Sequence, residues 1–228
     1  MRALILALVM AVSSGAAHAD ILSLWGARAF NGDVAATLAQ YKTLTPLAEK
    51  HGAQVELFVD DTLGQQQVTF GMRFNTLTDW GTFKDAFNND PEVAAWMAEN
   101  QPDYNRHFTQ SMLWANVSSP GAGVGIVEGK NVFWAGSFMA TSPSNADRTV
   151  REFTKMAKYI EGLGGTAHIY TNGIDDNIWF TFAFDSFSEG SQLFTQLATD
   201  KAWQKIVSDF GAKNLARASS QSWVTRGQ

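Results

Sequence analysis

Three charged or titratable side chains fall on predicted strands, at positions that face away from the helix-covered side. Glu56 and Arg73 belong to one predicted hairpin, and His168 lies on a strand in the second half of the chain. Counting from a turn centre near Gly64 places Glu56 opposite Arg73, which predicts a cross-strand ion pair with a structural role. The same count places His168 opposite Ala183, without a carboxylate partner. As catalytic groups, Glu56 or His168 would serve as general base, and Arg73 would stabilise developing negative charge.

Aromatic side chains are expected on the same inner face as these polar groups. The candidates for ligand binding are Phe58, Tyr170, Trp179, Trp25 and Trp134. Such rings stack on flat, partly polar molecules, and a few convergent polar groups orient them. The alternative is a filled core, since a barrel of eight strands is often just wide enough for its own side chains. Trp25 and Trp134 lie on short outer strands, whose phase is less well determined than that of the middle strands.

Composition excludes several kinds of site. The 228 residues include no cysteine, which rules out thiolate metal sites, cysteine-ligated iron–sulfur clusters and a cysteine nucleophile. His51 at a helix end and His107 in a connector lack metal-ligand spacing with His168, so we expect no metal and no cofactor. The 17 Lys and Arg residues are scattered among 22 Asp and Glu residues, which argues against a nucleic-acid partner.

The first 19 residues have the order of a secretory signal. Met1-Arg2 is positively charged, Ala3 to Val12 is apolar, and Ala17-His18-Ala19 has the small residues of a cleavage site. The apolar run is too short for a membrane-spanning helix, and no later stretch approaches the roughly 20 residues needed. We expect an exported protein without a membrane span, beginning at Asp20. Export without cysteine favours the periplasm of a Gram-negative bacterium.

The rest of the chain is a duplicated pattern. Residues 70–83 (FGMRFNTLTDWGTF) correspond to residues 180–193 (FTFAFDSFSEGSQL) at a constant offset of 110. In both copies a strand leads into a helix that breaks and restarts, with Asp90 and Asp200 as N-caps. We therefore expect a first repeat over 20–118, a glycine-rich linker over 119–130 and a second repeat over 131–228.

Each repeat is predicted to run strand, helix, strand, strand, helix, strand. The expected ranges are 21–30, 34–51, 54–60, 67–75, 79–99 and 111–117, and then 131–140, 146–163, 166–172, 177–185, 188–209 and 221–226. This order is ferredoxin-like, with an antiparallel sheet covered by helices on one face. The strands are apolar on both faces, so the two bare faces are expected to cover each other. The predicted fold is α+β, with tandem ferredoxin-like units forming one intramolecular barrel, and hence a monomer with an internal pseudo-dimer.

This element order, the Phe-x-Phe-Asp/Asn strand that leads into a broken helix and the duplication resemble the dimeric α/β-barrel superfamily. That superfamily includes the antibiotic-biosynthesis monooxygenase-like and stress-responsive barrel families. The resemblance implies that two units, usually from separate chains, are fused here. It also implies that a ligand would lie in the barrel or between a sheet and its helices. The fold hosts oxygenases, lyases, isomerases, haem proteins and simple binders.

Haem-degrading members of the superfamily use an Asn, a Trp and a His in fixed places. In this chain the first strand lacks the Asn, Phe87 stands at the place of the Trp, and Met97 stands near that of the His. Haem degradation is therefore not expected, while haem binding through His168 or His107 stays open.

Three functions follow from these patterns. The first is an exported protein that binds a small aromatic or apolar ligand in or beside the barrel. The second is a cofactor-free enzyme of the monooxygenase-like or isomerase kind. The third is a structural or envelope-stress protein without a ligand.

Overall fold

A computed structural model describes residues 21–29, 33–60, 67–116, 130–171 and 176–226. The predicted signal over 1–19 and the linker over 119–130, apart from Lys130, lie outside these ranges, so both stay predictions. None of the helices in the described ranges is long and apolar enough to cross a bilayer.

Both halves have the predicted strand and helix order. The first half consists of β1 (Ile21–Arg28), α2 (Val34–Glu49), β2 (Gln54–Asp60), β3 (Gln67–Phe74), α3 (Leu77–Asn88), α4 (Pro91–His107) and β4 (Phe108–Asn116). The second half consists of β5 (Val132–Ala140), α5 (Pro143–Gly162), β6 (Thr166–Thr171), β7 (Asn177–Phe184), α6 (Phe187–Thr199), α7 (Lys201–Lys213) and β8 (Ala216–Arg226). The last strand of each half begins earlier than predicted. In β8 the added stretch has small and polar residues without apolar alternation, and its pairing with β5, from Ala140 opposite Ala216, makes it a strand.

The eight strands close into one barrel, in the order β1-β3-β2-β8-β5-β7-β6-β4. Within each half the four strands have the same relative order, and all their pairings are antiparallel. The halves join at two equivalent seams. At one, β2 pairs with β8 from Phe58 opposite Arg226, and at the other, β6 pairs with β4 from Tyr170 opposite Asn116. The predicted intramolecular barrel is thus confirmed, with the two halves related by a pseudo-two-fold axis.

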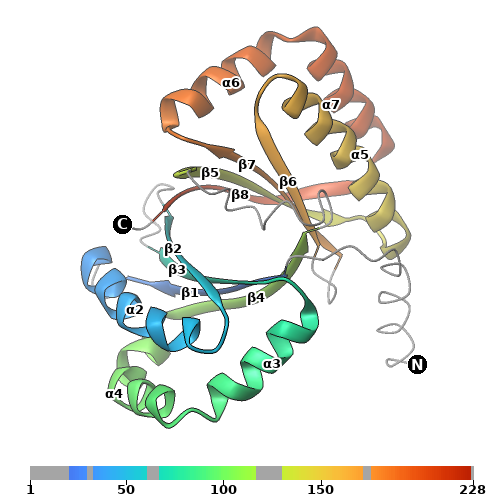
Figure 1. Cartoon of the computed structure of the whole chain (residues 1–228). Coiled ribbons are helices and arrows are strands. Elements are labelled where there is room, and N and C mark those ends of the chain that lie inside the picture. The colour runs from blue at the N-terminus through green and yellow to red at the C-terminus, as the bar shows by residue number, and fades with distance from the viewer. Residues whose placement is uncertain (1–20, 30–32, 61–66, 117–129, 172–175, 227–228) are drawn as a thin grey trace.

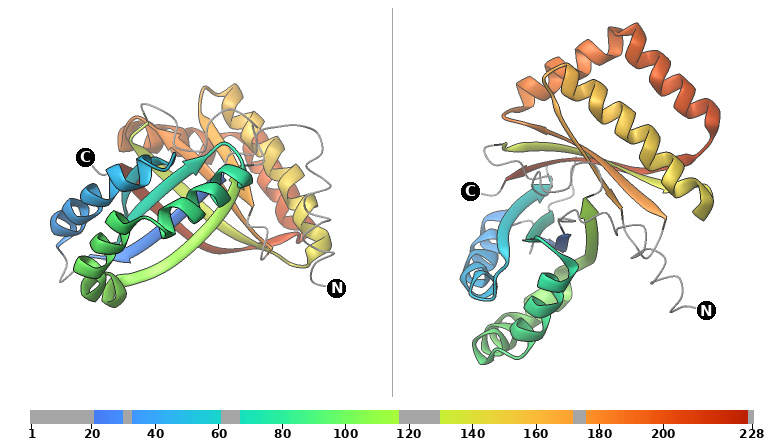
Figure 2. Two further views of the ribbon diagram at one scale, coloured as in Figure 1. Left: turned by 60° about the horizontal axis from the view of Figure 1, so that its bottom comes forward. Right: turned by 45° about the vertical axis from the view of Figure 1, so that its right-hand side comes forward.

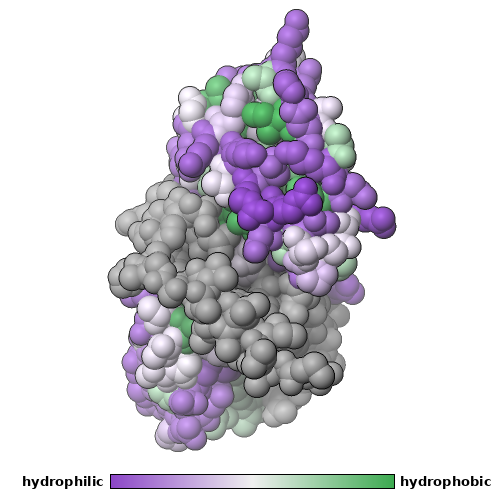
Figure 3. Space-filling model, turned by 90° about the vertical axis from the view of Figure 1, so that its right-hand side faces the viewer, coloured by the Kyte–Doolittle hydropathy of each residue, from purple (hydrophilic) through white to green (hydrophobic). Residues whose placement is uncertain are grey.

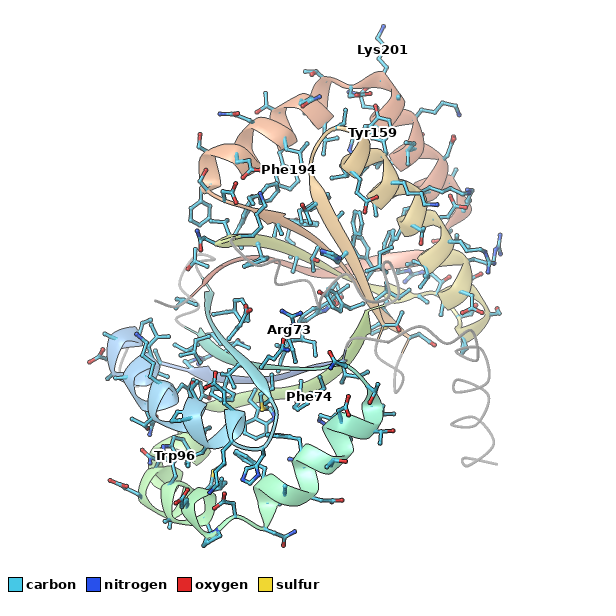
Figure 4. The ribbon with its side chains drawn as sticks, viewed as in Figure 1. Arg73, Phe74, Trp96, Tyr159, Phe194 and Lys201 are labelled. Carbon is cyan, nitrogen blue, oxygen red and sulfur yellow. The ribbon has the colours of Figure 1, made fainter. Side chains whose placement is uncertain are left out.

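The helices lie outside the barrel, three against each sheet (Figure 1, Figure 2). Alternation along the strands separates two layers of side chains. In Figure 4, the neighbouring residues Arg73 and Phe74 illustrate this, because Arg73 lies between the two sheets and Phe74 lies on the helix side. Phe70, Met72 and Phe74 pack under the helices of the first half, as predicted. Phe180, Phe182 and Phe184 do the same in the second half.

A cap built on an aspartate begins the second part of each broken helix. The Asp90 carboxylate accepts a hydrogen bond from the backbone N–H of Glu92 at 2.8 Å and lies 2.8 Å from Lys50 Nζ and 2.6 Å from His51 Nε2. These contacts hold the pKa of Asp90 well below its ordinary value, the hydrogen bond from Lys50 contributing most. Asp200 caps α7 through the backbone N–H groups of Ala202 and Trp203, as the repeat predicts.

Replacing Asp90 with asparagine should lower the melting temperature by about 3–6 °C at pH 7, because it removes the charge that Lys50 and His51 contact. The unfolded carboxyl titrates near its ordinary pKa of 3.8, whereas the folded carboxyl resists protonation. As the pH falls through that value, the unfolded chain takes up the proton first, so the stabilising effect is full above about pH 5 and fades below pH 4.

Thermal unfolding of the parent and of Asp90→Asn between pH 3 and pH 7 tests this. The gap between the two melting temperatures should narrow as the pH falls below about 4. Asp209→Asn, which removes the exposed Lys205 pair, is the control and should change little at any pH. A gap of constant size would contradict the assigned role of Asp90.

Candidate functional site in the barrel interior

The inner face of the barrel brings together polar groups from both halves. Glu56 on β2 and Arg73 on β3 come from the first half, while His168 on β6 and Thr181 on β7 come from the second. The barrel interior thus contains a carboxylate, a guanidinium, an imidazole and a hydroxyl among apolar side chains.

Glu56 and Arg73 form a diagonal pair rather than the directly opposed pair that was predicted. Arg73 lies opposite Gln54, and Glu56 lies opposite Gly71, so the predicted register was wrong by two residues. A diagonal neighbour is still within reach of a long side chain, and Arg73 Nη1 lies 3.9 Å from Glu56 Oε1. Their side chains keep 19% and 20% of their full exposure. The separation is too long for a hydrogen bond, so this is a loose, partly solvated ion pair.

Among Glu56, Arg73 and His168, the histidine is the most deeply buried, with 5% exposure. It lies opposite Thr181 and not Ala183, an error of two residues like that in the first hairpin. Neither ring nitrogen has a hydrogen-bond partner within the part of the chain that the structure describes. Burial, helped by the positive charge of Arg73, lowers the pKa of His168 to about 4. At neutral pH the ring is therefore uncharged and presents one donor and one acceptor.

An apolar cluster with members from both halves packs beside these polar groups. Its buried residues are Leu22, Leu24, Phe58, Phe133, Tyr170 and Ala183, and Trp179 packs against it. The rings of Phe58 on β2 and Phe133 on β5 meet edge to face at the seam between the halves, with centroids 5.8 Å apart. Three of the five aromatic residues proposed for ligand binding, Phe58, Tyr170 and Trp179, are thus next to the polar groups.

The other two aromatic candidates lie on the opposite side of the sheets. Trp25 packs under the helices of the first half, stacked on Phe70 at 6.1 Å. Trp134 packs under those of the second half, 5.2 Å from Phe182. Their placement in the barrel interior was wrong, because both alternating sets of β1 and β5 are apolar and either set fits a buried face. The predicted companions Trp114 and His107 have side chains outside the described set.

Residues at equivalent places in the two halves differ in chemistry. The hairpin registers make Glu56 equivalent to His168, and Arg73 equivalent to Ala183. Gly71 is equivalent to Thr181, and a Cβ at Gly71 would come within 3.0 Å of Phe58 Cε2. Sequence reasoning missed Gly71 as a position of the inner face. The 110-residue offset, which aligns it with Thr181, is the signal that could have found it.

The space under the helices of the first half is a packed core. Trp25, Phe83 and Phe87 are buried there, and Met97 packs against them. Among the described residues, no group of three His, Asp or Glu side chains could hold a metal ion. The interior of the barrel is therefore the better candidate for a site. On the face drawn in Figure 3, hydrophilic residues predominate over the described surface.

Comparison with known proteins identifies the fold and no close relative. No protein-family model and no curated protein matches the sequence. Solved structures match over most of the chain. One is an anthrone oxidase-like protein with 11% identity and a TM-score of 0.61, covering 95% of this chain and 94% of that chain. Another is a proposed monooxygenase from Fusobacterium nucleatum subsp. nucleatum with 8% identity and a TM-score of 0.58, covering 92% and 93%.

A mutant chlorite dismutase from Candidatus Nitrospira defluvii, in complex with cyanide, is also similar. It has 13% identity and a TM-score of 0.51, and the match covers 94% of this chain and 93% of that chain. At such low identities the likeness shows the fold alone.

Proposed function

We propose that this chain, which has the dimeric α/β-barrel fold within one polypeptide, is an exported monomer that binds one small aromatic ligand in the barrel interior. The observation that carries the proposal is the pair of buried His168 ring nitrogens without partners among the described residues. A buried polar group without a hydrogen bond costs about 1–3 kcal/mol. A ligand with a donor and an acceptor would remove this cost.

The surroundings of His168 suit an aromatic ligand. Tyr170 and Trp179 are directly opposite each other on neighbouring strands, and both belong to or touch the interior apolar cluster. Aromatic walls favour flat molecules through offset or edge-to-face contacts. The side chains of Arg73 and Glu56 keep 19% and 20% of their exposure, which supports a site that a ligand can reach from solvent.

Native mass spectrometry of the protein purified from its own cells tests for a retained ligand. His168→Leu should lower occupancy at least several-fold, because the ligand loses the imidazole donor and acceptor that orient it. The same substitution should leave the free energy of unfolding unchanged or raise it by about 1–2 kcal/mol, since it removes unpaired buried nitrogens.

His51→Leu is the matched control, since His51 contacts Asp90 outside the barrel. It should lower stability and leave occupancy intact, the reverse of His168→Leu. Equal ligand occupancy in the parent and His168→Leu would exclude His168 from the site. An empty protein that His168→Leu stabilises would favour the structural function instead.

Export and oligomeric state complete the proposal. The charged start, apolar run and small residues before Asp20 support cleavage at that point in a periplasmic protein. Since each half already has its barrel partner within the chain, light scattering of the mature protein should give the mass of a monomer. A mass of two chains would contradict this part.

The second candidate is an enzyme of the cofactor-free monooxygenase-like or isomerase kind. The observation that favours it is the neutral imidazole of His168 near the guanidinium of Arg73. His168 or Glu56 would remove a proton, and Arg73 would stabilise the resulting anion. A pKa of about 4 makes His168 a weak base at pH 7, so the geometry supports binding better than catalysis.

A further inference from the structure

Two unpaired groups, one from each half of the barrel, restrict the chemistry of the ligand. Arg73 Nε is buried and, like the ring nitrogens of His168, has no hydrogen-bond partner among the described residues. The positive charge of Arg73 is close enough to His168 to lower its pKa. Both side chains lie on the inner face of the closed barrel, Arg73 on β3 and His168 on β6.

The Nε atom of the guanidinium has no hydrogen-bond acceptor among the described residues. Arg73 contacts Glu56 through Nη1 at 3.9 Å. The guanidinium presents its N–H groups in a planar fork that matches the two oxygens of a carboxylate. A neutral imidazole nearby can donate one further hydrogen bond to the same group.

We infer that the ligand is an aromatic monocarboxylate, with its carboxylate between Arg73 and His168 and its ring among Phe58, Tyr170 and Trp179. The inference rests on the proposed function and adds the charge of the ligand to it. Charge-assisted hydrogen bonds are roughly twice as strong as neutral ones, so the anion should bind better than a neutral compound of the same shape.

Glu56 has the opposite effect on such a ligand. Its carboxylate is near the same guanidinium and repels a second negative charge. Replacing Glu56 with glutamine should therefore increase the affinity for the anion and leave that for a neutral compound almost unchanged.

Calorimetric titration with 2-naphthoate and with its neutral analogue 2-naphthamide tests the inference. In the parent protein, 2-naphthoate should bind at least about 10-fold more tightly. Arg73→Gln should abolish the difference, and Glu56→Gln should enlarge it several-fold. Arg73→Lys, which keeps the charge and loses the fork, should retain part of it. Arg148→Gln, a change on the exposed side of α5, is the control and should have no effect.

The possible outcomes separate the two proposals. If 2-naphthamide binds as tightly as 2-naphthoate, or if Arg73→Gln keeps the preference, the inference is wrong and the proposed binding function stands. If neither compound binds at millimolar concentration, the inference is wrong, and the retained ligand sought by native mass spectrometry decides the proposed function. If Arg73→Gln fails to fold, Glu56→Gln is compared with the parent instead. An unchanged preference for 2-naphthoate over 2-naphthamide in Glu56→Gln would contradict the inference.

Discussion

Replacing Phe153 with alanine is expected to lower the free energy of unfolding by about 3–5 kcal/mol. Phe153 on α5 is 1% exposed and joins that helix to its sheet and to α7. Its ring centroid lies 4.8 Å from that of Phe138, 5.1 Å from that of Phe180 and 5.1 Å from that of Phe210. Truncation loses these contacts and leaves a cavity that three neighbouring elements cannot easily close.

Urea denaturation followed by circular dichroism measures the change. Phe187→Ala is the matched control, since Phe187 is 42% exposed, and it should cost less than about 1.5 kcal/mol. A loss in Phe153→Ala no greater than that in Phe187→Ala would show that the helices of the second half are not held by this core.

Phe58→Ala should be almost as damaging, with a loss of about 3 kcal/mol, for a different reason. Phe58 is 6% exposed and contacts Phe133 of the other half. Its burial therefore depends on the closure of the barrel and not on packing within its own half. If the sheet were open and Phe58 exposed, Phe58→Ala would lower the free energy of unfolding by less than about 1 kcal/mol.

A double-mutant cycle with Phe133→Ala measures the contact between the halves. The edge-to-face pair should give a coupling energy of about 0.5–1.5 kcal/mol. A coupling energy near zero would mean that the two inner faces do not meet in solution.

The sequence was sufficient for the element order and for the barrel. The 110-residue offset revealed the duplication, and the double-sided apolar strands indicated that two sheets cover each other. The starts of β4 and β8 were missed, because hydrogen bonding to a neighbouring strand can hold a segment such as Ala216–Ser219 that has no strand pattern of its own. The signal and the linker remain expectations from sequence.

Strand register was the main error within the site. In both hairpins the predicted pairing was displaced by two residues, so Glu56 and His168 were given wrong opposite neighbours. A shift of two keeps every side chain on its face, which is why Glu56, Arg73 and His168 were still placed correctly in the interior. Register depends on the length of the turn, which composition does not specify.

That His168 has no hydrogen-bond partner among the described residues could not be predicted. A strand histidine is recognisable in sequence, but its hydrogen bonding depends on where Thr181, Arg73 and the opposite sheet lie. The side of the sheet on which Trp25 and Trp134 lie could not be predicted either. Their strands are apolar on both faces, so the hydrophobic pattern does not indicate which face contacts the helices.

The two halves of this chain can differ in sequence, whereas the two subunits of a homodimer are identical. In a symmetric assembly of identical subunits, any arginine placed as Arg73 is would occur twice, and two like charges would face the same enclosed volume. Here Ala183 takes the second place, and His168 occupies the counterpart of Glu56. Because the two halves are covalently linked, each can mutate independently of the other. The barrel interior is therefore asymmetric, with the Arg73 cation in the first half and the neutral His168 ring in the second.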